Sequence, residues 1–349
     1  VRSSNGMNVK LRRPLDFLVV ADHAGYMGVI DSVRKLDPAL LETKNGKKLF
    51  DKFHKALDKM LEDPLPDWSL FAKLSKEIGE EGIVMETTYR QSVWQKVVAL
   101  ADENNSPGKF TAFIGYEWSS YSKGTIHRVA IFRDSADKAL QVLPYSTDDG
   151  LNPERFWNYL ENYQRKTGGE IIAIPHNANM SNGQTFSLLN FDGLPINKQY
   201  ATTRSRWEPL YEVTQIKGDS ETHPALSPTD EFSDYETWNG SIAQWAIRPE
   251  NWKEWGPKEQ QKVKHEYARS ALKLGLQVQE NLGVNPFKFG LIGSTDAHTA
   301  LATADENNFW GKFAQHAPNP NRMQNPRYKW KQSAAGYAAV WAEANTRES

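Results

Sequence analysis

Short apolar runs recur along this chain, and they constrain its fold more than any other feature. Each run is continuous rather than alternating, which is typical of a parallel strand buried on both faces. We therefore predict buried parallel strands at residues 16–21 (DFLVVA), 110–116 (FTAFIGY), 129–132 (VAIF), 170–174 (EIIAI), 210–216 (LYEVTQI), 289–293 (FGLIG) and 336–341 (GYAAVW).

Helical stretches lie between many of these runs. Residues 152–168 begin with Asn-Pro and end in Gly, and residues 257–282 begin with Pro and precede Gly283, which are common helix start and stop signals. Residues 49–61 are predicted to place six apolar side chains on one helix face: Leu49, Phe50, Phe53, Leu57, Met60 and Leu61. Strands that alternate with helices predict an α/β fold with a parallel sheet.

We find no clear linker and therefore predict a single domain over residues 1–349. Two stretches fit the strand–helix pattern poorly and are predicted to be insertions. The first is Trp-rich and lies near residues 225–256, and the second is Asn/Pro-rich and lies near residues 305–333.

Composition limits the partners and the metal ligands that this chain can have. The formal net charge is -1, with acidic and basic residues interleaved, so we do not expect nucleic acid as a partner. No apolar run approaches the roughly 18–20 residues of a membrane span, so we expect a soluble protein of the cytoplasm or periplasm that acts on a small molecule. Cysteine is absent, so any metal must be held by His, Asp and Glu. The oligomeric state is left open.

Polar residues able to bind a metal lie at the ends of these predicted strands. In barrels of parallel strands the C-terminal strand ends meet at one mouth, where active sites lie. Each residue alone is more often a hydrogen-bonded structural group, but the repetition at successive strands favours a shared site for Zn, Mn or Fe. The candidate ligands are His23, Glu117, His127, His176, Asp296 and His298.

Six segments around these residues resemble the polymerase-and-histidinol-phosphatase (PHP) superfamily of metal-dependent hydrolases, and specifically a bacterial branch described as a domain of unknown function. The segments are RRPLDFLVVADHAGYMG, FIGYEWSS, HRVAIFR, IPHNANMSNG, EVTQIKGDSETHP and GLIGSTDAHT. The resemblance implies a distorted TIM-like (β/α)7 barrel, two or three divalent metal ions and hydrolysis of a phosphoester. It also places the same six candidate ligands on metal-ligand positions.

The sequence departs from the family pattern in two ways, one of which is that family members continue past residues 345–349 (NTRES). The superfamily pattern opens with His-x-His upstream of Asp22 and His23, whereas no His occurs in residues 1–15. We therefore expect the barrel to lack its first strand and two ligands, and the chain to be a piece of a longer protein. That loss would weaken metal binding and impair activity.

Further residues are candidates for substrate contact and proton transfer. Residues 211–224 typify the branch and place Glu212, Lys217, Glu221 and His223 at the mouth, or else form a polar loop that caps the barrel. Arg128 is predicted either to neutralise an anionic substrate or to pair with a nearby carboxylate. Asn177 is a weaker substrate contact. Asp22 or His223 is the candidate for protonating the leaving group.

These residues together predict hydrolysis by a metal-activated water. By resemblance the substrate is a phosphoester, while the same chemistry would serve a carboxylic ester, an amide or a sulfate ester. A second hypothesis is a metal-binding or ligand-binding scaffold that has lost catalysis. A third is a carbohydrate-binding barrel, suggested by the 12 Trp residues.

Overall fold

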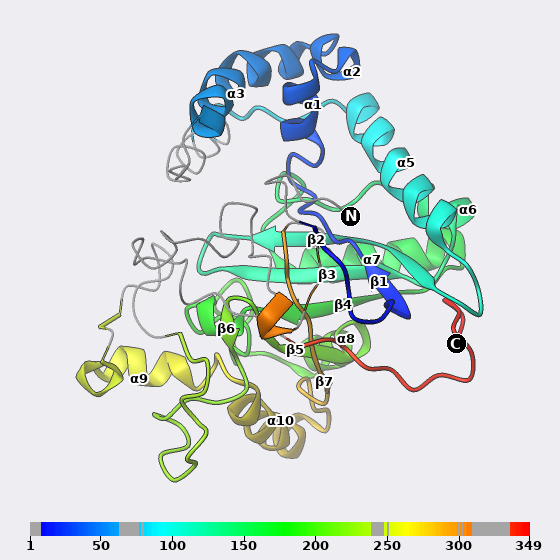
Figure 1. The fold of residues 1–349 in the computed structure, drawn as a ribbon. Coiled ribbons are helices and arrows are strands. Elements are labelled where there is room, and N and C mark those ends of the chain that lie inside the picture. Colours follow the sequence, from blue (N-terminus) through cyan, green and yellow to red (C-terminus); the bar gives the residue numbers. More distant parts are fainter. Residues whose placement is uncertain are drawn as a thin grey trace.

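Two open β-sheets of mixed strand direction form the centre of the molecule (Figure 1). The computed structural model describes residues 8–62, 77, 80–238, 248–249, 251–298, 301, 303, 305–308 and 336–349. The first sheet has the order β1-β2-β3-β4, formed by Phe17–Val19, Thr111–Ser120, Ile126–Phe132 and Ile171–His176. The second has the order β6-β5-β7, formed by β5 (Leu210–Gln215), β6 (Gly218–Asp219) and β7 (Gly290–Gly293).

The prediction that all strands are parallel is wrong. β1 runs parallel to β2, and β5 runs parallel to β7, but β3 is antiparallel to both β2 and β4. Only residues 121–125 connect β2 to β3. A connection this short can join antiparallel strands, whereas parallel strands need a crossover of a dozen or more residues.

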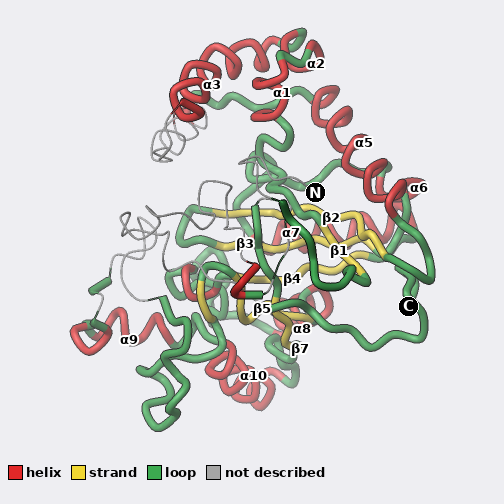
Figure 2. The backbone as a smooth tube through the Cα atoms, viewed as in Figure 1, coloured by secondary structure: helices red, strands yellow, loops and turns green. Residues whose placement is uncertain are grey.

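The α/β class is confirmed, but no barrel closed by hydrogen bonds is found among the described strands. β4 packs beside β5, so the two sheets follow each other around the centre without a shared ladder (Figure 2). The predicted strand at residues 336–341 is wrong, because these residues form no strand. Tyr337, Val340 and Trp341 are exposed, so this apolar run is not a buried element.

One group of helices lies at an end of the molecule, beyond the edge of the first sheet (Figure 1). It comprises α1 (Val29–Lys35), α2 (Pro38–Leu41), α3 (Lys44–Glu62) and the start of α5 (Thr87–Asn104). The predicted helix at residues 49–61 lies within α3, and its Leu49, Phe53 and Leu57 are buried in the core of this group. The side chains of Met60 and Leu61 lie outside the described part.

The largest core lies between the first sheet and its helices. α5 packs on β2, while α7 (Pro153–Thr167) and α8 (Lys198–Trp207) pack on β4, and α6 (Ala136–Ala139) packs on α5. The predicted start and stop of α7 are confirmed. The Asn152 side chain accepts a hydrogen bond from the Glu154 N–H (2.7 Å), and Gly168 ends the helix in the left-handed conformation at φ 64°.

The helix predicted over residues 257–282 is instead two helices, α9 (Pro257–Val263) and α10 (Ala268–Leu282). The chain leaves the helical path between them because α10 starts against another segment. The N–H groups of Ala268 and Arg269 donate to the carbonyls of Ser220 (2.9 Å) and Glu221 (3.0 Å). Pattern alone does not reveal such a tertiary contact.

Short 3-10 helices complete the fold: η1 (Ala178–Met180), η2 (Trp252–Glu254) and η3 (Glu306–Asn308). Of the two predicted insertions, residues 239–247, 250 and 309–333 lie outside the described residues. Across the part that the structure describes, none of the helices has the length and apolar character needed to cross a membrane.

Candidate metal centre

The alternation of side chains along β2 directs Glu117 away from the hydrophobic core. Its neighbours Tyr116 and Trp118 are both buried in the core against the helices, and successive side chains of a strand point to opposite faces. Across β3 and β4, His127 lies directly opposite His176 in the register, so their side chains are also neighbours. Three adjacent strands thus bring a carboxylate and two imidazoles to one place.

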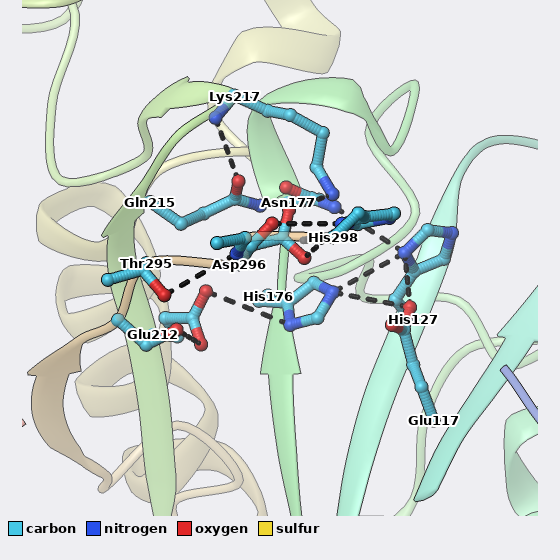
Figure 3. Close-up of polar contacts among 12 residues, drawn as sticks. Glu117, His127, His176, Asn177, Glu212, Gln215, Lys217, Thr295, Asp296 and His298 are labelled. Carbon is cyan, nitrogen blue, oxygen red and sulfur yellow. Dashed lines mark hydrogen bonds and ion pairs between the residues drawn. The ribbon is translucent and has the colours of Figure 1, made fainter. Parts of the chain in front are cut away.

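Figure 3 shows these three side chains pointing toward one another. Glu117 Oε1 lies 2.5 Å from His127 Nδ1 and 3.4 Å from His176 Nε2, and the two nitrogens are 3.3 Å apart. All three residues are buried. They form a group that could hold a metal ion, with one ligand atom from each residue.

The donor set fits a divalent cation. Zn²⁺ bonds of about 2.0–2.1 Å imply tetrahedral ligand atoms roughly 3.3–3.4 Å apart, so two of the three separations match and the shortest would open by roughly 0.8 Å. In the described part of the chain, the ion-pair contacts of the Glu117 carboxylate are all to histidine nitrogens. His127 Nε2 is a buried atom without a hydrogen-bond partner there. Buried charges are normally paired or bind metals.

The electrostatics favour the metal-binding protonation states of Glu117 and His127. Burial disfavours the charged imidazolium and lowers the pKa of His127 to about 4, although Glu117 opposes this shift. Burial also disfavours the Glu117 carboxylate, but the neighbouring histidines outweigh it and hold its pKa well below 4.5. A carboxylate beside a neutral imidazole is the form in which both bind a metal.

His23 lies beside this group. β1 ends at Val19, but the chain continues along β2 and makes an isolated bridge between His23 and Glu117. The His23 Nδ1 atom lies 3.6 Å from Glu117 Oε1 and hydrogen-bonds with the Ser119 hydroxyl at 2.7 Å. The His23 side chain is 40% exposed, so it lies on the open side of the group.

Asp296 and His298 lie next to the three-residue group rather than in it. The His298 ring centroid is 6.4 Å from that of His23, which brings the segment after β7 to the same site. The Asp296 carboxylate forms an ion pair with the Lys217 ammonium, and one of its oxygens lies 3.9 Å from His298 Nδ1. Of the six predicted ligands, the structure therefore gathers three tightly and places the other three around them.

Two residues at this site have left-handed backbone conformations that are uncommon outside glycine. Asn177, directly after His176, has φ 57°, and Asp296 has φ 46°. Asn and Asp tolerate this region best, yet such backbone strain clusters at functional sites. The Asn177 side-chain amide lies 3.4 Å from His127 Nδ1.

Glu212 lies on the other side of His176. Its Oε1 is 3.8 Å from His176 Nδ1, and its Oε2 accepts a hydrogen bond from the Ser294 hydroxyl at 2.8 Å. Burial raises the pKa of Glu212, although His176 opposes the shift. For His176 itself, burial would lower the pKa, but Glu212 and Glu117 outweigh it and raise the value.

Arg128 faces away from this site, because it follows His127 on the same strand. Its Nε donates to the Glu208 carboxylate at 2.8 Å, and Glu208 also accepts from the Trp157 indole at 2.8 Å. Of the two predicted alternatives for Arg128, the structure shows the ion pair with a nearby carboxylate.

The remaining predicted residues have varied surroundings. Glu221 pairs with Arg269 at 2.7 Å. His223 is fully buried, with its ring 4.9 Å from that of Trp255, and its Nδ1 accepts from the Ala225 N–H at 3.0 Å. Asp22 is exposed beside His23, and its carbonyl accepts from the Glu117 N–H at 2.8 Å.

Sequence reasoning missed three residues that hold this region together. Ser119 contacts His23, and it lies two residues after Glu117, so the strand period could have placed it on the same face. Ser294 contacts Glu212 and lies just ahead of Asp296. Glu208 carries no such signal, because its role depends on the packing of α8 against β3 and β4.

Comparison of the sequence with curated proteins gives no match, and comparison with solved structures gives none either. A family model does match, and it covers residues 1–349. Its description is "Protein of unknown function (DUF3604)", so it supplies no reaction or substrate for the site. The chain belongs to the DUF3604 family.

Proposed function

We propose that this chain is a metal-dependent hydrolase that cleaves a phosphoester. The observation that carries the proposal is the buried group of Glu117, His127 and His176, whose facing atoms are 2.5–3.4 Å apart. The resemblance of its strand-end motifs to the PHP superfamily supplies the reaction class. We further propose that the strands, arranged as β1-β2-β3-β4 and then β5-β7, correspond to a distorted barrel of that type.

We assign the first metal ion to Glu117, His127 and His176, with His23 as the nearest additional ligand. A second ion would use Asp296 and His298. Zn, Mn and Fe all suit this mixture of carboxylate and imidazole. A divalent ion bound here would lower the pKa of water toward about 7 and polarise the scissile bond.

The surrounding residues provide substrate contact and proton transfer in this proposal. His23 and His298 have side chains that are 40% and 28% exposed, so the substrate approaches from their side. Lys217, whose ammonium lies at Asp296, attracts the negative charge of a phosphoester. We assign leaving-group protonation to the exposed Asp22 rather than to His223, which is fully buried.

Hydrolysis of p-nitrophenyl esters tests this function. The wild-type protein is loaded with Zn²⁺ or Mn²⁺ and assayed on the phosphate monoester, the phosphate diester, the acetate and the sulfate, with and without EDTA. We expect phosphoester cleavage that EDTA abolishes and that Glu117→Gln reduces to background. Glu170→Gln, which removes an exposed carboxylate just ahead of β4, serves as the control and should retain activity.

Three outcomes would contradict all or part of the proposal. Metal binding without turnover of any of the four esters would favour the scaffold that has lost catalysis. Turnover that is unaffected by EDTA would exclude a metal-dependent reaction. Cleavage of the acetate or the sulfate alone would keep the metal centre but replace the substrate class.

A further inference from the structure

The two ring nitrogens of His176 face two different carboxylates. Nε2 points to the metal-binding group, 3.4 Å from Glu117 Oε1, while Nδ1 points to Glu212 Oε1 at 3.8 Å (Figure 3). Both His176 and Glu212 are buried. Within the described residues, His176 Nδ1 and Glu212 Oε1 each lack a hydrogen-bond partner. Two unsatisfied buried atoms of complementary type therefore face each other.

The position of Glu212 is fixed by the second sheet. Its other oxygen accepts from the Ser294 hydroxyl, and the Ser294 N–H donates to the Thr214 carbonyl at 3.1 Å. The register between β5 and β7 shifts between Glu212 and Thr214, as at a β-bulge. Bulges occur next to active sites, where they redirect a side chain. The backbone irregularity thus coincides with the residue that faces His176.

A histidine that binds a metal through one nitrogen needs its proton on the other. In metal sites that proton is almost always donated to a carboxylate, a carbonyl or a water, which fixes both the tautomer and the ring orientation. A separation of 3.8 Å is too long for a hydrogen bond, and a movement of roughly 0.9 Å would give a normal one. The contact with Ser294 uses the other oxygen of Glu212, so the two contacts do not compete for one acceptor atom.

We propose that Glu212 is a positioning residue for the metal centre: it accepts the Nδ1 proton of His176 and thereby holds Nε2 ready to bind the ion. This inference rests on the proposed function, since it requires metal binding at His176. It assigns the second sheet a role in metal affinity, although the three closest ligands all come from the first sheet. Ser294 supports the same arrangement, because its hydroxyl donates a hydrogen bond to the other oxygen of Glu212.

Zn²⁺ affinity, measured by competition with a chelator, tests the proposal. We expect the Kd of Glu212→Ala to rise about 10- to 100-fold, the usual effect of losing such a partner. Glu212→Gln keeps the volume and should give a smaller rise, and Ser294→Ala the smallest. Glu266→Gln removes another buried carboxylate, one that pairs with Arg248, and should leave the Zn²⁺ affinity unchanged.

NMR of protein labelled with ¹⁵N-histidine adds a measurement that general destabilisation would not change. In the Zn²⁺-bound wild type we expect His176 to carry its proton on Nδ1. An unchanged Zn²⁺ affinity in both Glu212 variants, or a His176 protonated on Nε2, would overturn the proposal while leaving the hydrolase intact. A wild type that binds none of Zn²⁺, Mn²⁺ and Fe²⁺ would overturn both.

Discussion

Four glutamates of the described chain are buried. Their surroundings divide them into two pairs: Glu208 and Glu266 are the first pair, and Glu117 and Glu212 are the second. Glu208 lies between two arginines, with Arg128 Nε at 2.8 Å and Arg204 Nε at 3.1 Å. Glu266 binds both terminal nitrogens of Arg248 at 2.7 and 2.5 Å. In this first pair, the protein supplies the cation that each buried carboxylate needs.

The second pair, Glu117 and Glu212, has histidines in the place of arginines. The ion-pair contacts found for both carboxylates in the described residues are to imidazole nitrogens. Imidazole is a weak source of positive charge near neutral pH and a good metal ligand. The difference indicates that the first pair serves the stability of the fold, whereas the second faces the histidines of the candidate metal centre.

Breaking the ion pair between Arg248 and Glu266 should have the largest effect on the free energy of unfolding. Arg248→Met leaves the Glu266 carboxylate buried without its cation, so we expect the free energy of unfolding in urea to fall by roughly 3–5 kcal/mol. The double variant Arg248→Met, Glu266→Leu removes both charges and should recover most of that loss. If the free energy of unfolding of Arg248→Met lies within about 1 kcal/mol of the wild-type value, this account of Glu208 and Glu266 is contradicted.

A divalent cation that binds at Glu117 should stabilise the protein. At a free Zn²⁺ concentration of about 100 times its Kd, the free energy of unfolding should rise by about 2.7 kcal/mol. Glu117→Gln should show little of this gain, while Glu208→Gln should keep it. Equal stabilisation of Glu117→Gln and wild type in urea titrations would mean that the ion binds elsewhere.

The arginine-paired Glu208 should also show a defined pH dependence. Burial opposes its charge, but Arg128 and Arg204 outweigh it and lower the pKa below the ordinary 4.5. Its stabilisation is therefore complete above pH 4.5 and disappears as the pH falls through the folded pKa. We expect Glu208→Gln to cost about 1.5–3 kcal/mol at pH 7 and progressively less in acid. A cost that is constant down to pH 2.5 would contradict the assignment.

The smallest effect is expected for Glu117→Gln in the presence of EDTA. Without a metal, this carboxylate faces imidazoles instead of a guanidinium group, so the free energy of unfolding should fall by less than the roughly 3–5 kcal/mol expected for Arg248→Met. Urea denaturation of Glu117→Gln and of Arg248→Met under the same conditions gives the comparison directly. A loss as large as that of Arg248→Met would show that Glu117 is a structural residue like Glu266.

The sequence predicts the positions of the candidate ligands better than it predicts the sheet. Glu117, His127 and His176 were identified because polar residues bordered apolar runs, and the structure brings them together. Strand direction was wrong, because continuous apolar runs do not distinguish a hairpin from a crossover. The antiparallel β3 explains why His127 lies near the start of its strand and still reaches the same edge.

Contacts between distant segments set the limit of sequence reasoning here. The two-residue strand period could have shown that Arg128 points away from His127, and so away from a shared substrate. The pairing of Glu212 with His176 depends on β5 packing beside β4 and on a register shift, neither of which leaves a local pattern. The burial of His223 among aromatic side chains depends likewise on residues 252–267 folding over it.

The most direct test of the metal centre is zinc content by elemental analysis after equilibrium dialysis. Wild type is compared with the double variant His127→Ala, His176→Ala and with His265→Ala, a histidine that contacts the Phe186 carbonyl instead of the site. We predict at least one zinc ion per chain in wild type and in His265→Ala, and none in the double variant. A wild type without zinc, or a double variant that retains as much zinc as wild type, would contradict the account.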